Sequence, residues 1–194
     1  MIPIRNNNFK KKCYSSLKRY PTIRISPVSW ITYIATERPV VVFYDKMFLK
    51  NVTVNSRRYS RKDPRYYINI YMETQVAMGN NVGLNFYFFE LKANRYFRTF
   101  VEMHFRGCDF KKPNTIFGHS VVKALSNRTC PFKPGHYMFS NLTIPLKSIP
   151  ETFPYKQGRL LCNVSADHDG TTTRIAEAYI DLEVRVAHIR KDVQ

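Results

Sequence analysis

The sequence lacks any uninterrupted run of eighteen apolar residues, which is the length that a membrane-spanning helix requires. It also lacks the GxSxG, P-loop and GxGxxG motifs of common enzymes and nucleotide-binding proteins. Its five histidines show no HExxH or other metal-ligand spacing. Asp167, His168 and Asp169 precede Gly170 in a segment that is typical of a hairpin turn. We therefore expect no catalysis, no cofactor and no metal site.

Acidic residues are scarce, because 14 Asp and Glu accompany 31 Lys and Arg, for a formal net charge of +17. Residues 1–50 contain ten of the basic residues and two of the acidic ones. A second basic cluster consists of Arg57, Arg58, Arg61, Lys62 and Arg65. Such a charge favours nucleic acid as a partner. No RNP-type aromatic motif, zinc knuckle or helix-turn-helix pattern accompanies it, so nucleic-acid binding is the less favoured hypothesis, beside a solvated basic surface.

Only four cysteines are present, Cys13, Cys108, Cys130 and Cys162, and they allow three pairings. None has CxxC spacing, which argues against a zinc site or thioredoxin-like chemistry. Cys108 and Cys130 each lie beside an expected strand and bracket a helix-sized segment, which suggests a disulfide across that segment. Such a bond would stabilise the fold by roughly 3 kcal/mol and persists in oxidising compartments. The alternative is two buried free thiols.

Alternation of apolar and polar residues predicts most of the chain to be β-strand. The clearest case is residues 97–105, where Phe97, Val101, Met103 and Phe105 share one face. Other strands are expected in these ranges: 39–45, 46–56, 66–74, 82–91, 136–145, 159–165 and 174–186. In the strand at 136–145, Met138, Leu142 and Ile144 are expected to face inward. Residues 114–125 predict a short helix, because Ile116, Val121, Val122 and Leu125 recur near helical spacing.

Seven or eight strands with frequent turns predict an all-β, immunoglobulin-like antiparallel β-sandwich with one short helix between Cys108 and Cys130. We place this domain at residues 38–188, with a C-terminal tail at 189–194. Residues 1–37 form a basic N-terminal tail or an atypical targeting segment. Their basic stretch precedes a weak apolar patch at 28–35, which is the polarity of a signal sequence with too long a basic part.

Four N-x-S/T sequons occur, at Asn51, Asn127, Asn141 and Asn163. Three fall on the outward-facing parity of expected strands, and Asn127 lies in the loop before Cys130. A glycan needs an accessible site, so this placement favours export and predicts glycosylation at these positions. The alternative is that asparagine is usually exposed in any protein.

Several motifs resemble a known family: GCDF, CPFKPGHYMFSNLTIP and FPYKQGRLLCNVSADHDGTTTRIAEAYIDLEV. They are similar to an insect-specific secreted domain family without an established activity, which includes the chemosensory CheA and CheB proteins. The resemblance covers about residues 46–186 and implies the Cys108–Cys130 pairing. Cys162 occupies a position that is usually aliphatic in that family, and Cys13 lies outside the matched region, so no pairing of these two is implied.

The CP-F-K-x-G-x-x-Y element is also similar to the lipid-recognition (ML) domains of the Niemann-Pick type C cholesterol carrier and the ganglioside activator. This distant resemblance implies an ML-like sandwich that admits an apolar chain between its sheets.

The sequence therefore leads to the hypothesis of a secreted, non-catalytic protein that binds a lipid or hydrophobic semiochemical, with a membrane receptor as a further partner. The expected ligand-lining residues are Phe86, Phe88, Phe97, Val101, Met103, Phe105 and Ile180; plain core packing is the alternative for each. The basic cluster at Arg57–Arg65 would favour anionic headgroups. The competing hypothesis is an extracellular protein-interaction module with a filled core and no ligand.

Overall fold

The computed structural model describes residues 28–60, 63–112, 119–125, 127–144, 154–168 and 170–190, without the side chains of residues 28–31, 119, 168 and 187–190. Cys13, Asp169 and the outer part of both predicted tails lie outside these ranges. The described elements are β1 (Val28–Tyr44), β2 (Leu49–Arg57), β3 (Tyr67–Thr74), β4 (Val82–Lys92), β5 (Arg95–Arg106), the 3-10 helix η1 (Asp109–Lys111), α1 (His119–Ala124), β6 (Gly135–Leu142), β7 (Gln157–His168) and β8 (Thr171–Arg190).

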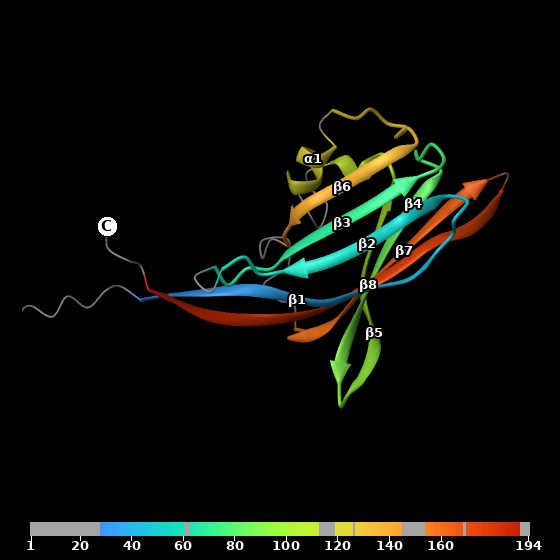
Figure 1. Ribbon diagram of the computed structural model, residues 1–194. Helices are drawn as coiled ribbons and strands as arrows, with labels where there is room; N and C mark the ends of the chain where they lie inside the picture. The colour runs from blue at the N-terminus through green and yellow to red at the C-terminus, as the bar shows by residue number, and fades with distance from the viewer. Residues whose placement is uncertain are drawn as a thin grey trace, which may run out of the picture.

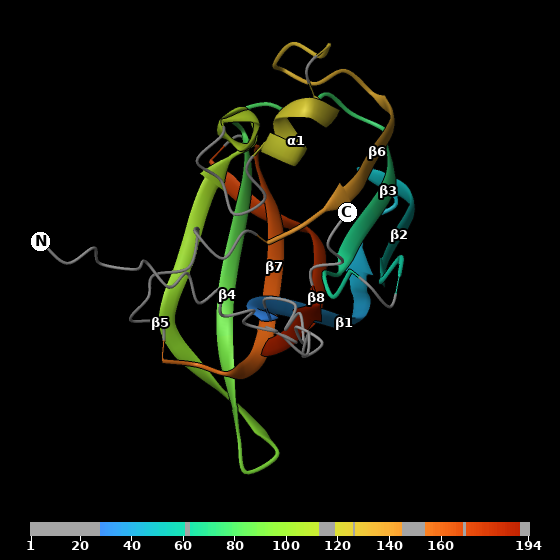
Figure 2. The same cartoon turned by 90° about the vertical axis from the view of Figure 1, so that its left-hand side faces the viewer.

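The strands form two antiparallel sheets that face each other (Figures 1 and 2). The larger sheet has the order β1-β8-β7-β4-β5, and the smaller one has the order β2-β3-β6. One short helix, α1, and a disulfide between Cys108 and Cys130 complete the described fold. The predicted all-β sandwich, its short helix and its disulfide are thus confirmed. No described helix has the length and apolar character needed to cross a membrane.

Alternating side chains of the two sheets build the core between them. Ile68, Phe139 and Leu142 from the smaller sheet pack in one cluster with Phe86, Leu160 and Ile180 from the larger sheet. Val121 and Leu125, from α1 and the residue after it, join this cluster. The predicted apolar spacing of the helix therefore buries it against the sandwich, although residues 113–118, where the predicted helix began, lie outside the described ranges.

Strand β1 begins at Val28, ten residues before the predicted domain boundary. Its first half pairs with the end of β8, from Val28 opposite Arg190 to Glu37 opposite Asp181. The segment includes Ser, Thr and Tyr among its apolar residues, which is a poor composition for a signal sequence and a good one for a partly exposed strand. Figure 1 shows the β1–β8 pair as a long ribbon that extends beyond the smaller sheet.

A bulge in β6 changes which of its side chains face inward. The prediction that Met138 faces inward is therefore wrong. Met138 is 69% exposed, whereas its neighbours Tyr137 and Phe139 are buried. The pairing of β3 with β6 shifts between Ile68 and Ile70, and Asn141 has a φ of 59° at this point. A bulge inserts an extra residue, so the inward parity differs on its two sides.

Candidate ligand cavity between the sheets

A cavity of about 220 Å³ lies between the two sheets. From the smaller sheet it is lined by Val52, Val54, Ile68, Ile70, Met72, Phe139 and Leu142. From the larger sheet it is lined by Leu84, Phe86, Leu160, Cys162, Val164, Ala176, Ala178 and Ile180. Ala176 and Ala178 on β8 have short side chains, which leave room where a larger residue would fill the core.

Three segments cover one end of the sandwich: residues 107–112, 119–125 and 127–134, here called the cover. Phe110, Leu125 and Phe132 of the cover line the cavity. Figures 1 and 2 both show α1 and the 127–134 segment at the end of the molecule opposite the β4–β5 hairpin tip. The Cys108–Cys130 disulfide joins two of these segments, with the Cα atoms 5.6 Å apart. The cysteine pair therefore joins two segments of the cover that contribute to the cavity lining.

Gly107 allows the cover to pack closely at this point. A Cβ atom there would lie 2.5 Å from the carbonyl oxygen of Gly79, which is far too close. The Gly107 amide instead donates a hydrogen bond to the carbonyl of Val82 (2.8 Å). A residue without a side chain is thus required where the chain leaves β5 for the cover.

Two hydroxyl groups among the lining side chains, those of Tyr137 and Thr74, have hydrogen-bond partners. The Tyr137 hydroxyl donates to the carbonyl of Lys133 (2.5 Å). The Thr74 hydroxyl accepts a hydrogen bond from the Gly135 amide (3.2 Å) and lies 3.4 Å from the Gly135 carbonyl. Burial raises the pKa of the Cys162 thiol to about 12, so the thiol is neutral and a poor nucleophile. The described lining therefore provides an apolar environment and no free acid, base or anion.

The seven residues predicted to line a ligand site do not all meet at the cavity. Phe86 and Ile180 line it. Met103 and Phe105 on β5 pack against the core cluster without lining the cavity, and Val101 is half-buried on the same strand. Phe88 and Phe97 lie elsewhere, as described next.

Phe88 is buried, but it packs against the Tyr155 ring with centroids 5.4 Å apart and stands close to Gly158. Phe97 is 51% exposed, because the β4–β5 hairpin projects past the end of the sandwich (Figure 1). Alternation assigned both residues to the inward face, but it does not show where along a strand the opposite sheet ends. Aliphatic residues of β2 and β3, which the prediction did not include, also line the cavity, as do the two alanines on β8.

The four sequons are all at or near the surface. Asn51, Asn127 and Asn141 are exposed, whereas Asn163 is half-buried between Asn85 of β4 and Glu177 of β8. Asn51 and Asn141 also have φ values of 51° and 59°. Asparagine tolerates this left-handed conformation better than most residues, which is a second reason for its presence at these two positions.

The titratable groups outside the cavity form ion pairs on the surface. Asp167 accepts from the Arg106 guanidinium (2.8 Å) and the Thr172 hydroxyl (2.7 Å), and the Thr172 bond, with Arg106, lowers the pKa of Asp167. The β7–β8 hairpin therefore holds Asp167 in a structural role. Among the described residues, no group of three His, Cys, Asp or Glu side chains could hold a metal ion.

The predicted basic cluster of the β2–β3 connection is partly neutralised in the same way. Arg65 forms a salt bridge with Asp63 (2.9 Å), and Arg58 donates to the carbonyls of Ser60 and Asp63. Arg57 lies over the Tyr59 ring, 4.4 Å from its centroid. Arg61 and Lys62 lie outside the described residues. The contacts of Arg57, Arg58 and Arg65 thus stabilise the loop itself.

Comparison with known proteins gives a match for part of the chain only. No curated protein matches the sequence. Residues 84–157 match the model of a family described as a protein of unknown function (DUF1091). The matched region runs from β4 through the cover to the first residue of β7. It therefore includes the disulfide and the cover residues that line the cavity. In this region the chain is similar to a family to which no function has been assigned.

Proposed function

We propose that this protein binds a small hydrophobic molecule between its two sheets and does not transform it. The observation that carries the proposal is the apolar cavity of about 220 Å³. Moving an apolar ligand from water into such a cavity gains about 25 cal/mol for each Å² of apolar surface removed from water. Because the lining is almost wholly apolar and the Tyr137 and Thr74 hydroxyls already have partners, the buried part of the ligand should be hydrocarbon.

The size of the cavity limits the ligand. An engineered protein cavity of about 150 Å³ binds benzene, whereas sites for drug-sized ligands begin at about 300 Å³. The observed volume lies between these values and suits a compact hydrophobic semiochemical. A long acyl chain would enter only in part, or would need the sheets to move apart.

Export from the cell belongs to the same proposal. The disulfide supports an oxidising compartment, and three of the four sequons are exposed enough for glycosylation. A secreted binder would deliver or present its ligand to a membrane receptor. The resemblance to chemosensory proteins and to ML domains agrees with this role.

The first test is mass spectrometry of the full chain secreted by insect cells, under native and then denaturing conditions. The expected result is a glycosylated protein with an intact Cys108–Cys130 bond and an additional mass that is lost on denaturation. A secreted, disulfide-bonded protein with no additional mass, and with no affinity for naphthalene as a fluorescent apolar probe, would contradict the proposal.

A cavity-filling variant links binding to the cavity. Ala178→Leu places a larger side chain in the lining, and Ser140→Leu makes a matched change on the exposed face of β6. We expect naphthalene affinity to fall by at least about tenfold in the first variant and to stay unchanged in the second, because loss of a few buried methylene contacts costs about 1–3 kcal/mol. Circular dichroism checks that both variants fold.

A second candidate, the protein-interaction module, is favoured by the aromatic side chains of the β4–β5 hairpin. Phe100 is 80% exposed and Phe97 51% exposed, which is unusual for large apolar side chains unless they contact a partner. Sedimentation of the ligand-free protein tests this candidate. Self-association that Phe100→Ser abolishes would support it, and a monomer at high concentration would argue against a second copy as the partner.

A further inference from the structure

The cover has a strongly positive outer surface. Residues 107–134 contain five basic residues, Lys111, Lys112, Lys123, Arg128 and Lys133, and a single acidic residue, Asp109. Asp109 is already paired with Lys112 at 2.7 Å. The cover therefore has a net charge of +4.

Local contacts hold these cations together. The Lys111 ammonium donates to the carbonyl of Arg128 (2.9 Å), across a sequence separation of 17 residues. The Arg128 guanidinium lies 4.4 Å from the centroid of the Tyr137 ring and donates to the carbonyl of His136 (3.0 Å). Together with the Cys108–Cys130 disulfide, these bonds bring cations from both ends of the segment to one end of the molecule.

The outer face of the larger sheet differs from the cover in its charge pairing. On the outer face of the larger sheet, basic side chains are paired with acids: Arg106 with Asp167 (2.8 Å), Arg159 with Asp181 (2.8 Å) and Arg185 with Glu183 (2.5 Å). These pairs offset basic charge on that face, whereas the cover has five basic residues and one acidic residue. An excess of this kind attracts an anionic surface.

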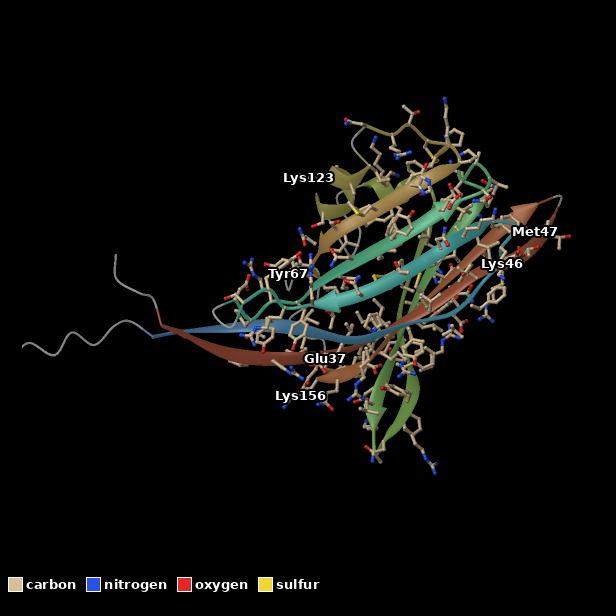
Figure 3. All side chains as sticks on the ribbon, viewed as in Figure 1. Glu37, Lys46, Met47, Tyr67, Lys123 and Lys156 are labelled. Carbon is tan, nitrogen blue, oxygen red and sulfur yellow. A yellow bond between two sulfur atoms is a disulfide. The ribbon has the colours of Figure 1, made fainter. Side chains whose placement is uncertain are left out.

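The two sides of the cover have different chemistry. Phe110, Leu125 and Phe132 line the cavity on the inner side, while Lys112, Lys123 and Lys133 are exposed on the outer side. In Figure 3, Lys123 lies beside α1, far from Lys46 at the turn between β1 and β2. The positive surface is thus separated from the ligand cavity only by the thickness of the cover.

We propose that the outer surface of the cover docks on an anionic lipid bilayer. Each Lys or Arg near such a bilayer strengthens binding by about fivefold, and lysines extend their ammonium groups to the headgroups while their stems stay on the protein. Single-stranded nucleic acid is disfavoured, because its binding sites present exposed aromatic rings for base stacking. The described aromatic residues of the cover, Phe110 and Phe132, face the core.

Docking in this orientation would place the cover, and the cavity behind it, against the membrane. The proposal concerns a surface and does not depend on whether the cavity holds a ligand. Its test therefore uses the ligand-free protein, and its failure would leave the proposed apolar binding intact.

Vesicle sedimentation of the full chain tests the proposal, with neutral phosphatidylcholine vesicles and vesicles that contain added phosphatidylserine. The cover variant carries Lys112→Gln, Lys123→Gln and Lys133→Gln. The matched control carries Lys46→Gln, Lys92→Gln and Lys156→Gln, which removes the same charge at exposed sites elsewhere. Lys92 matches Lys112 in particular, because it is also paired with a nearby acid, Glu90 (3.3 Å).

We expect the wild-type protein to bind the anionic vesicles and not the neutral ones, and to dissociate as salt is raised. The cover variant should bind on the order of 100-fold more weakly, since three cations are lost. The control should stay within about fivefold of wild type, because charges farther than about 10 Å from the bilayer are screened. Basic residues 1–27 are present in all three proteins, so they contribute equally to the comparison.

Three results would overturn the proposal. The first is an absence of binding to anionic vesicles by the wild-type protein. The second is an equal loss of binding in the cover variant and the control, which would show attraction by total charge alone. The third is binding to RNA or heparin, lost in the cover variant, without binding to vesicles, which would identify an acidic polymer as the partner.

Discussion

At the scale of single residues, the chain places non-glycine residues in the left-handed region at turns and bulges. Arg38, Asn51, Ala93, Asn94 and Asn141 have φ values between 47° and 61°. The asparagines suit this conformation, because a short polar side chain tolerates it. Ala93 has no polar side chain that would help it adopt this conformation. Its position nevertheless requires positive φ, because it is the first residue of the two-residue turn between β4 and β5.

Ala93→Asn should therefore raise the free energy of unfolding by about 0.5–1 kcal/mol, because the left-handed conformation costs alanine more than asparagine. Urea denaturation of the two proteins measures the difference. The same substitution at Ala124, which is exposed in α1, should lower the free energy by a few tenths of a kcal/mol through helix propensity. Equal effects of the two substitutions would contradict this account.

The residue scale also shows where alternation is insufficient. The sequence correctly placed Phe86 and Ile180 beside the space between the sheets, since their strands alternate regularly. It failed for Met138, because nothing in HYMFSNLTIP separates a bulge at Asn141 from a regular strand. It failed for Phe97, because its exposure depends on the length of β5 relative to the facing sheet, which is a tertiary property.

At the scale of elements, the Cys108–Cys130 disulfide determines how the cover is attached. The cover contains only short helices, η1 and α1, and helices of this length are not stable alone. Their order depends on packing of residues such as Val121 and Leu125 on the sandwich and on the covalent bond between the two ends of the segment. This element was predictable from the sequence, because the cysteines bracket an amphipathic segment between two clear strands.

Replacing both cysteines, as Cys108→Ser with Cys130→Ser, should lower the free energy of unfolding by roughly 3 kcal/mol, which is the entropy of closing a loop of this length. Urea denaturation with and without reductant provides the measurement. The wild-type protein should become equal to the double variant in reductant, while the variant should not respond. If reductant does not change the free energy of unfolding of the wild-type protein, the disulfide contributes little to stability.

At the scale of the whole molecule, acidic residues are few, and several have strong partners. The Arg65 hydrogen bond holds the pKa of Asp63 well below its usual value of 3.8, and the Arg185 hydrogen bond lowers the pKa of Glu183 from 4.5. Arg98 lowers the pKa of Glu102 in the same way. In each case the folded state binds protons less readily than the unfolded chain does.

Stability should therefore be greatest above about pH 5 and should fall as the pH decreases through 4. The sign follows from the lowered pKa: the unfolded chain takes up protons first, so acid favours unfolding. Urea midpoints between pH 7 and pH 3 measure this dependence. Asp63→Asn should show a smaller fall over the same range, and an identical fall would show that the Asp63–Arg65 pair contributes no acid sensitivity.

The whole sandwich was predictable because long alternating strands and frequent turns leave few other solutions. The cavity was not, because a filled core and a cavity use the same inward apolar positions. What decides between them is the sum of side-chain volumes across two sheets, including the small residues Ala176 and Ala178 of the lining. That sum depends on the register between sheets, and the sequence of a single chain does not specify it.

The sheet topology has a consequence for motion. Among the strands that the structure describes, no ladder joins the two sheets. A polar link between them is the bond between the Thr36 and Ser56 hydroxyls (2.8 Å) near the β1–β2 edge. The sheets can therefore separate by a small amount while every ladder stays intact. A ligand would then exchange through breathing of the sandwich, and amide hydrogens in both sheets would remain protected from solvent exchange while it does so.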